Sequence, residues 1–110
     1  MFNITIHNLR NEKPTHIYDV RVDRTSPLGN PFYMANESQR HEVCLKYTNW
    51  FNRRIINKDS AAVMDALNNL LKTYEEYGIL RLFCWCAPKQ CHAETIRDYL
   101  INIINGNLKP

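Results

Sequence analysis

The segment ILRLFCWCAPKQCHAETI, residues 79–96, decides the fold. Its first seven residues are apolar except for Arg81, which is the pattern of a strand buried inside a sheet. Apolar residues at helical spacing follow from Ile96 onward, so the second half predicts a helix over residues 93–105 that Gly106 ends. A buried strand that leads into a helix through a short loop is the building unit of an α/β sheet. We therefore expect a buried central strand over residues 79–85.

Two shorter patterns of alternating apolar and polar residues precede this segment. They cover residues 2–6 and 18–23, and each predicts a strand with one apolar face. Residues 25–32, TSPLGNPF, contain two prolines and a glycine, so they predict a structured loop. An additional short strand at residues 32–34 is an open alternative.

Helical spacing of apolar residues marks two more elements. Residues 37–56 predict an amphipathic helix with Tyr47 on its buried face. The next helix begins at a cap, Asp59 or Ser60, and ends at Gly78. Taken together, the elements predict a small α/β domain with a Rossmann-like sheet flanked by helices, in two or three layers. An α+β arrangement is the alternative.

Length and composition fit one globular domain over residues 1–110. The chain is 45% hydrophobic and 23% charged, with aromatic residues throughout, which excludes a mainly disordered chain. No apolar stretch approaches the ~20 residues that a membrane-spanning helix needs. The first residues show no secretory signal, so we expect a cytoplasmic protein. The net charge of +3 is compatible with a phosphate-bearing ligand.

The loop over residues 21–32 is the first candidate site. Arg21 and Arg24 can grip a phosphate or carboxylate with two hydrogen bonds each. Gly29 can adopt a positive φ or allow a close backbone approach, and Asn30 can present its amide to a ligand. The alternative is a rigid turn without a ligand, whose arginines pair with the neighbouring aspartates.

The segment between the central strand and the last helix is the second candidate site. Ligands of open α/β sheets bind at this place, and the first turn of a helix attracts anions. Lys89 adds positive charge there. The helix N-terminus is expected to lower the pKa of Cys91, which makes it the most reactive cysteine if it is exposed, and to keep His92 neutral as a general base.

The cysteines allow three interpretations. They form a zinc site with His92, they fill a buried junction, or they belong to a ligand or catalytic loop. Cys84 and Cys86 lack the paired spacing of zinc hooks, so we predict neither a metal nor another cofactor. Cys44 is interpreted as core packing. The remaining histidines stand in polar surroundings and are interpreted as surface residues: His7, His16 and His41.

Two motifs, VRVDRTSPLGNPF at residues 20–32 and LFCWCAPKQCHAETI at residues 82–96, resemble domain-of-unknown-function family 4326, a family of phages and bacteria. The resemblance covers residues 17–101 and implies that the two loops form one site. Gln90 stands where the family often has a second proline. The matching residues are Arg24, Gly29, Asn30, Pro31, Phe32, Cys84, Cys86, Pro88, Cys91 and His92.

The first functional hypothesis is a protein that binds a nucleotide or a nucleotide derivative. Phosphate would lie on the last helix, with ligand contacts from Arg21, Arg24, Gly29, Asn30, Lys89 and Cys86. If the protein is an enzyme, His92 or Cys91 acts on a glycosidic or phosphoester bond. The expected partner is therefore a phosphate-bearing small molecule; a nucleic acid is less favoured, a membrane is not expected, and self-association is left open.

Two other classes of function compete with this hypothesis. One is a non-enzymatic phage counter-defence protein that sequesters a nucleotide signal in the host cytoplasm. The other is a zinc-stabilised interaction module. Recovery of an unaltered ligand separates the binder from an enzyme, and metal content identifies the zinc module.

Overall fold

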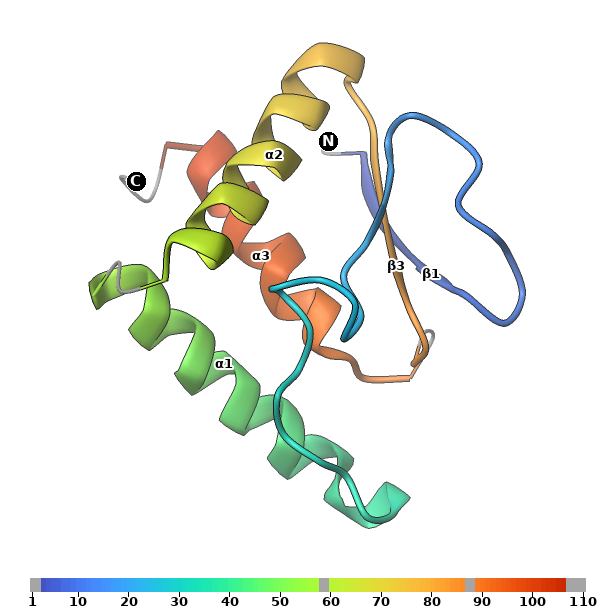
Figure 1. Cartoon of the computed structure of the whole chain (residues 1–110), viewed down its shortest axis with the longest axis vertical. Coiled ribbons are helices and arrows are strands. Elements are labelled where there is room, and N and C mark those ends of the chain that lie inside the picture. The colour runs from blue at the N-terminus through green and yellow to red at the C-terminus, as the bar shows by residue number, and fades with distance from the viewer. Residues whose placement is uncertain (1–2, 58–59, 87–88, 107–110) are drawn as a thin grey trace.

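A three-stranded parallel sheet forms the centre of the protein, which is described here from a computed structural model covering residues 3–57, 60–86 and 89–106. The strand order is β1–β3–β2, with bounds Ile4–Asn8 for β1, Leu80–Cys84 for β3 and Asp19–Arg21 for β2 (Figure 1). The predicted central strand is thereby confirmed. The start of the predicted first strand, Phe2, lies outside the described residues, and no strand forms at residues 32–34.

Helices begin and end where the chain supplies caps. The helices are η1 (Glu37–Gln39), α1 (Arg40–Asn57), α2 (Ala61–Tyr77) and α3 (His92–Ile104). The Ser60 hydroxyl accepts the Val63 N–H at 3.3 Å and starts α2, whereas the alternative cap, Asp59, lies outside the described residues. Gly78 ends α2 with a φ of 70°, which a glycine adopts without strain.

The α-helices lie on one side of the sheet (Figure 1). On that side β3 contributes Leu80, Leu82 and Cys84 to the apolar core. The α/β content is therefore as predicted. The finer expectation of Rossmann-like wiring is not confirmed, because β1 and β2 are joined by a loop without a helix. None of the described helices is long and apolar enough to cross a membrane.

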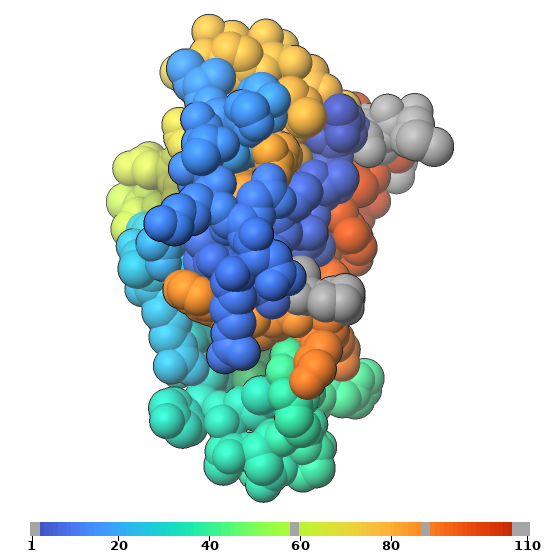
Figure 2. Space-filling model, turned by 90° about the vertical axis from the view of Figure 1, so that its right-hand side faces the viewer, coloured from blue at the N-terminus to red at the C-terminus, as the bar shows by residue number. Residues whose placement is uncertain are grey.

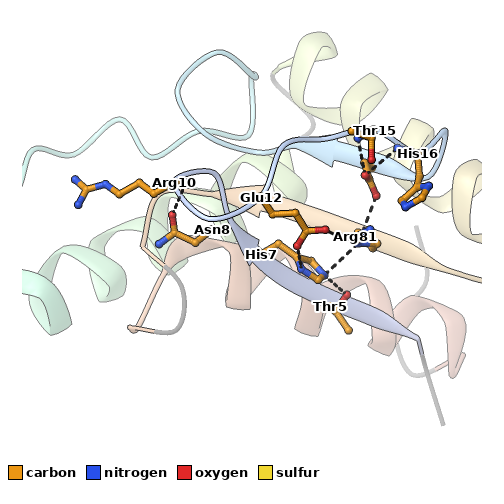
Figure 3. A network of polar contacts seen from close by, with 9 residues as sticks. Thr5, His7, Asn8, Arg10, Glu12, Thr15, His16 and Arg81 are labelled. Atoms are coloured by element: carbon orange, nitrogen blue, oxygen red, sulfur yellow. Dashed lines mark hydrogen bonds and ion pairs between the residues drawn. The ribbon is translucent and has the colours of Figure 1, made fainter.

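The other face of the sheet carries a set of polar contacts that we call the open-face cluster, formed by Thr5, His7, Glu12, Asp19 and Arg81 (Figure 3). Asp19 Oδ2 accepts the N–H groups of Thr15 and His16 at 2.9 and 3.0 Å, and Asp19 Oδ1 lies 3.5 Å from Arg81 Nε. Arg81 also pairs with Glu12.

The loop over residues 9–18, which is blue in Figure 2, lies over this side of the sheet. His7, interpreted as a surface residue, is half-buried instead and stacks on Phe83 at 5.2 Å between ring centroids. Burial lowers the pKa of His7, and the nearby Arg81 lowers it further, against an opposing effect of Asp19. His16 and His41 are exposed, as expected.

Candidate functional site

A cavity of about 570 Å³ lies at the carboxyl ends of β2 and β3. Its walls come from the loop after β2, from the start of α1 and from the segment after β3. The two loops that the sequence singled out therefore border one cavity. From the predicted set it brings together Arg21, Arg24, Asn30, Cys86, Cys91 and His92, whereas Gly29 and Lys89 do not line it.

Asp23 is the centre of the cavity's polar contacts. Its carboxylate accepts hydrogen bonds from Arg21, from the Thr25 hydroxyl at 2.6 Å and from Trp85 Nε1 at 2.9 Å. We call these four residues the cavity cluster. Burial on its own raises the pKa of Asp23, but the hydrogen bonds from Arg21, Thr25 and Trp85 outweigh it and lower the pKa to about 2. Asp23 is therefore an anion at neutral pH and holds the cluster together.

Trp85 presents a ring to the cavity. The side chain is 50% exposed although its Nε1 is held by Asp23. Side chains alternate between the two faces of a strand, which places Trp85 on the face opposite Cys84. No role was predicted for Trp85 from the sequence. One signal could have identified Trp85. It is an aromatic residue directly after a buried strand, while an acidic residue follows the end of another predicted strand.

Arg24 and Asn30 hold their own loop. Arg24 donates to the carbonyls of Asn30 and Phe32, from Nε at 3.1 Å and from Nη2 at 3.0 Å. Asn30 Oδ1 accepts the Phe32 N–H at 2.9 Å across the turn at Pro31. Both residues therefore act as clamps of the loop, as the rigid-turn alternative expects, although only Arg21 pairs with an aspartate and Arg24 bonds carbonyl oxygens instead. The Arg24 guanidinium also lies over the Tyr33 ring, 5.5 Å from its centroid.

Gly29 serves the packing of the same loop. A Cβ at this position would meet the Asp23 carbonyl oxygen at 2.5 Å, so no larger residue fits. A close backbone approach at Gly29 was predicted, but the approach is to the chain's own backbone at Asp23 and not to a ligand. The alternative prediction, a positive φ at Gly29, is wrong. Among the described glycines only Gly78 and Gly106 have a positive φ. The Tyr47 hydroxyl donates to the Leu28 carbonyl at 2.6 Å and ties the loop to α1.

The first turn of α3 is closed from within the protein. Cys91 caps the helix and is 3% exposed, and its N–H donates to the Glu94 carboxylate at 3.1 Å. His92 and Ala93 are 7% and 0% exposed. The structure therefore gives no support to a phosphate on this turn. Lys89, expected to add charge there, pairs with Glu37 at 3.3 Å.

Cys91 is not the reactive thiol that the helix N-terminus predicts. Its Sγ lies 3.1 Å from the Cys84 Sγ. The hydrogen bond with Cys84, that with Cys86 and burial all raise the pKa of Cys91, and the opposing contact from the Ala93 N–H is weaker. The expected fall in pKa is wrong because the sulfur faces other sulfur atoms in a buried position.

His92 is fixed in one tautomer. Its Nε2 lies 2.6 Å from the Val22 carbonyl oxygen, which can only accept, so Nε2 carries the hydrogen. Its Nδ1 is then an acceptor, 3.5 Å from the Cys91 Sγ. Burial lowers the pKa of His92, so the ring is neutral, as expected. Its role as a general base on a bound substrate stays a prediction.

Cys86 and Arg40 form the third part of the cavity wall. Cys86 is half-buried, and the Arg40 guanidinium on the same wall helps to lower the pKa of its thiol. Arg40 also donates to Glu37 at 2.8 Å and to the Gln90 carbonyl at 2.9 Å, which joins the start of α1 to the segment before α3. Arg40 carried no signal in the sequence, because it lies 46 positions before Cys86 and outside both motifs.

Metal binding has no support in the described part of the chain. There, no group of three or more histidine, cysteine or acidic side chains is arranged to hold a metal ion. Cys44, also on the cavity wall, is buried as the packing interpretation expects.

Comparison with known proteins gives one match. A family model described as "Domain of unknown function (DUF4326)" matches residues 6–102. No curated protein and no solved structure matches the chain.

Proposed function

Since the chain belongs to the family described as domain of unknown function DUF4326, whose description assigns no activity, we propose from the site itself that the protein binds a phosphate-bearing small molecule with a planar ring, a ligand of the nucleotide class. The observation that carries the proposal is the pairing of an exposed, oriented Trp85 ring with arginines around one cavity. The volume of about 570 Å³ is in the range of small-molecule sites.

Trp85 supplies the surface for the ring of the ligand. Nucleobases stack on exposed aromatic side chains, and each such contact contributes about 1–3 kcal/mol. The hydrogen bond from Trp85 Nε1 to Asp23 fixes the ring before a ligand arrives, so little entropy is lost on binding. Phe32 and Tyr33 line the same cavity and add apolar surface.

Arginine supplies the positive charge for the phosphate. The described residues that line the cavity include three arginines, Arg21, Arg24 and Arg40, and one acidic residue, Asp23. Arg40 is paired with Glu37, which is not among the lining residues. Arg21 donates to the Asp23 carboxylate from Nε and Nη2. Its Nη1 is not part of this pair, and the side chain is 42% exposed, so Nη1 can donate to a ligand. Arg24 is held by carbonyl oxygens rather than by a carboxylate, so among the described residues no ion pair neutralises its charge. Phosphate would therefore lie against Arg21 and Arg24.

Binding without turnover is the form of this function that the site supports best. Cys91 is buried, and Nε2 of His92 is occupied by a backbone carbonyl. Both residues line the cavity, but the Cys91 Sγ faces the Cys84 Sγ and His92 Nδ1 faces Cys91, so neither is directed at a bound substrate. A protein that sequesters a nucleotide signal fits these observations, and it is the alternative that the sequence also left open.

Mass spectrometry of the small molecules that co-purify with the protein tests this proposal. We expect a phosphate-bearing compound with a planar ring, recovered intact after incubation. Trp85→Ala, prepared in the same way, should lose it, while Tyr77→Ala, which removes an exposed aromatic ring outside the cavity lining, should retain it. Equal recovery from the two variants would place the ligand elsewhere and contradict the proposal.

A further inference from the structure

Three thiols lie beside the cavity, and they differ in access. Cys86 is half-buried and lines the cavity, whereas Cys84 and Cys91 are 0% and 3% exposed. The Cys91 Sγ lies 3.1 Å from the Cys84 Sγ, and Cys91 lines the same cavity as Cys86. A small reagent in the cavity therefore meets Cys86 first, with the thiol of Cys91 on the same wall.

The three thiols also differ in charge. The hydrogen bond from Cys91 lowers the pKa of Cys86 most, and the Arg40 guanidinium lowers it further, against the opposing effect of burial. The pKa of Cys91 is raised. The pair is thus one thiolate, at Cys86, and one thiol, at Cys91. Reactive cysteines have this combination of partial exposure and a positive neighbour.

We propose that Cys86 is a redox modification site: a hydroperoxide that enters the cavity oxidises it, and Cys91 then closes a Cys86–Cys91 disulfide. In the first step the Cys86 thiolate attacks the terminal oxygen of the hydroperoxide. The O–O bond breaks, the alkoxide or hydroxide leaves and takes a proton from solvent, and Cys86 becomes a sulfenic acid. Sulfur loses two electrons and the peroxide gains them.

In the second step Cys91 attacks the oxidised sulfur. His92 Nδ1, an acceptor 3.5 Å from the Cys91 Sγ, takes the thiol proton as the S–S bond forms. Hydroxide leaves Cys86 and regains that proton as water. Two thiols and one hydroperoxide therefore give one disulfide, one alcohol or water, and one further water. This chemistry does not depend on the nucleotide-class ligand.

Peroxide oxidation of the reduced, full-length protein tests the proposal. Hydrogen peroxide is added at pH 7, and peptide mapping without reduction follows each cysteine. We expect Cys86 to react about tenfold faster than in the same chain unfolded in urea, because an ordinary thiol is only a few per cent thiolate at that pH. The first linked peptide should join Cys86 to Cys91. Cys44→Ser is the matched control, since Cys44 lines the same cavity but burial raises its pKa, and it should leave the rate unchanged.

Two variants separate the steps. Cys91→Ser, which keeps a residue able to cap α3, should stop at a sulfenic acid on Cys86 that dimedone traps. Cys86→Ser changes a half-buried position and does not depend on that cap, so it tests the proposal even if Cys91→Ser fails to fold. It should abolish rapid oxidation and leave Cys84 and Cys91 reduced. Rapid formation of a Cys84–Cys91 disulfide in Cys86→Ser, or equal rates at Cys44 and Cys86 in the native chain, would overturn the proposal.

Discussion

One face of the sheet carries two clusters of arginine and aspartate that differ in what covers them. On the β2 side the alternating residues are Asp19, Arg21 and Asp23, and on the β3 side they are Arg81, Phe83 and Trp85. Asp19 is paired in register with Arg81, in the open-face cluster. Four residues further on, Asp23 holds Trp85, in the cavity cluster. Aspartate and arginine side chains thus occur at both ends of this face of the sheet.

Access separates the two clusters. In the open-face cluster the side chains of Asp19 and Arg81 are 0% and 13% exposed, because the loop over residues 9–18 covers them. In the cavity cluster the Arg21 side chain is 42% exposed and Trp85 is 50% exposed. The comparison teaches that a buried arginine–carboxylate pair stabilises the fold, whereas a carboxylate that orients partly exposed groups prepares a binding surface.

Arg81→Met has the largest expected effect. It leaves the Asp19 carboxylate buried without its cation, and breaking a buried pair costs about 3–5 kcal/mol. Urea unfolding should show that loss in the free energy of unfolding. Arg10→Met is the control, since the Arg10 side chain extends away from the cluster in Figure 3 and its loss should cost under ~0.5 kcal/mol. Equal stability of the two variants would show that the open-face cluster is not structural.

Trp85→Ala addresses the cavity cluster. Losing the stacking surface should weaken ligand binding by about 5- to 150-fold, from the ~1–3 kcal/mol of a base–aromatic contact. Stability should change little, because half of the side chain is exposed. Calorimetric titration of a nucleotide measures the affinity, with Tyr77→Ala as the comparison. A loss of stability as large as that of Arg81→Met would mean that both clusters serve the fold.

Asp23→Asn tests the cavity cluster through the pH dependence of the free energy of unfolding. The pKa of Asp23 is about 2 in the folded protein and near 3.8 in an unfolded chain, so its charge stabilises the fold above pH 4 and this contribution is lost as the pH falls toward 2. The native protein should exceed Asp23→Asn in stability by about 1–2 kcal/mol at pH 6, with the gap closing near pH 2. A gap that is constant with pH would show that the charge of Asp23 has no part in it.

Arg24→Ala has the smallest expected effect. The change removes two hydrogen bonds to loop carbonyls from an exposed side chain, and we expect a loss of about 1 kcal/mol in unfolding free energy. Lys13→Ala, also exposed, serves as the reference for an ordinary surface change. If Arg24→Ala matches that reference in stability but binds the nucleotide more weakly, the residue is a ligand contact only, as the sequence first indicated.

Local patterns in the sequence predicted the elements well. The apolar run before Trp85, the cap at Ser60 and the stop at Gly78 each depend on neighbours a few positions away. The central place of β3 followed from the same apolar run, and in a three-stranded sheet it fixes the order β1–β3–β2. The connection from β1 to β2 by a loop without a helix has no such local signal.

The site was predicted in outline and misassigned in detail. The family resemblance implied that the two loops form one site, and the structure brings both to one cavity at the strand ends. The roles of Asp23 and Trp85 arise from a contact between two strands, which the sequence alone does not show. The pKa of Cys91 was misjudged because the helix N-terminus is visible in the sequence, but the sulfur of Cys84 beside it is not.

Fluorescence of Trp85 tests the central claim most directly. The chain has two tryptophans, so Trp50→Phe leaves Trp85 as the only one and keeps an aromatic ring against Tyr47. Titrating this variant with nucleoside monophosphates should quench the fluorescence and saturate below about 1 mM, because a stacked base contacts the ring. Ribose phosphate, which lacks the base, should not quench it. Unchanged fluorescence with every nucleotide, or equal quenching by ribose phosphate, would contradict a cavity built around a stacking tryptophan.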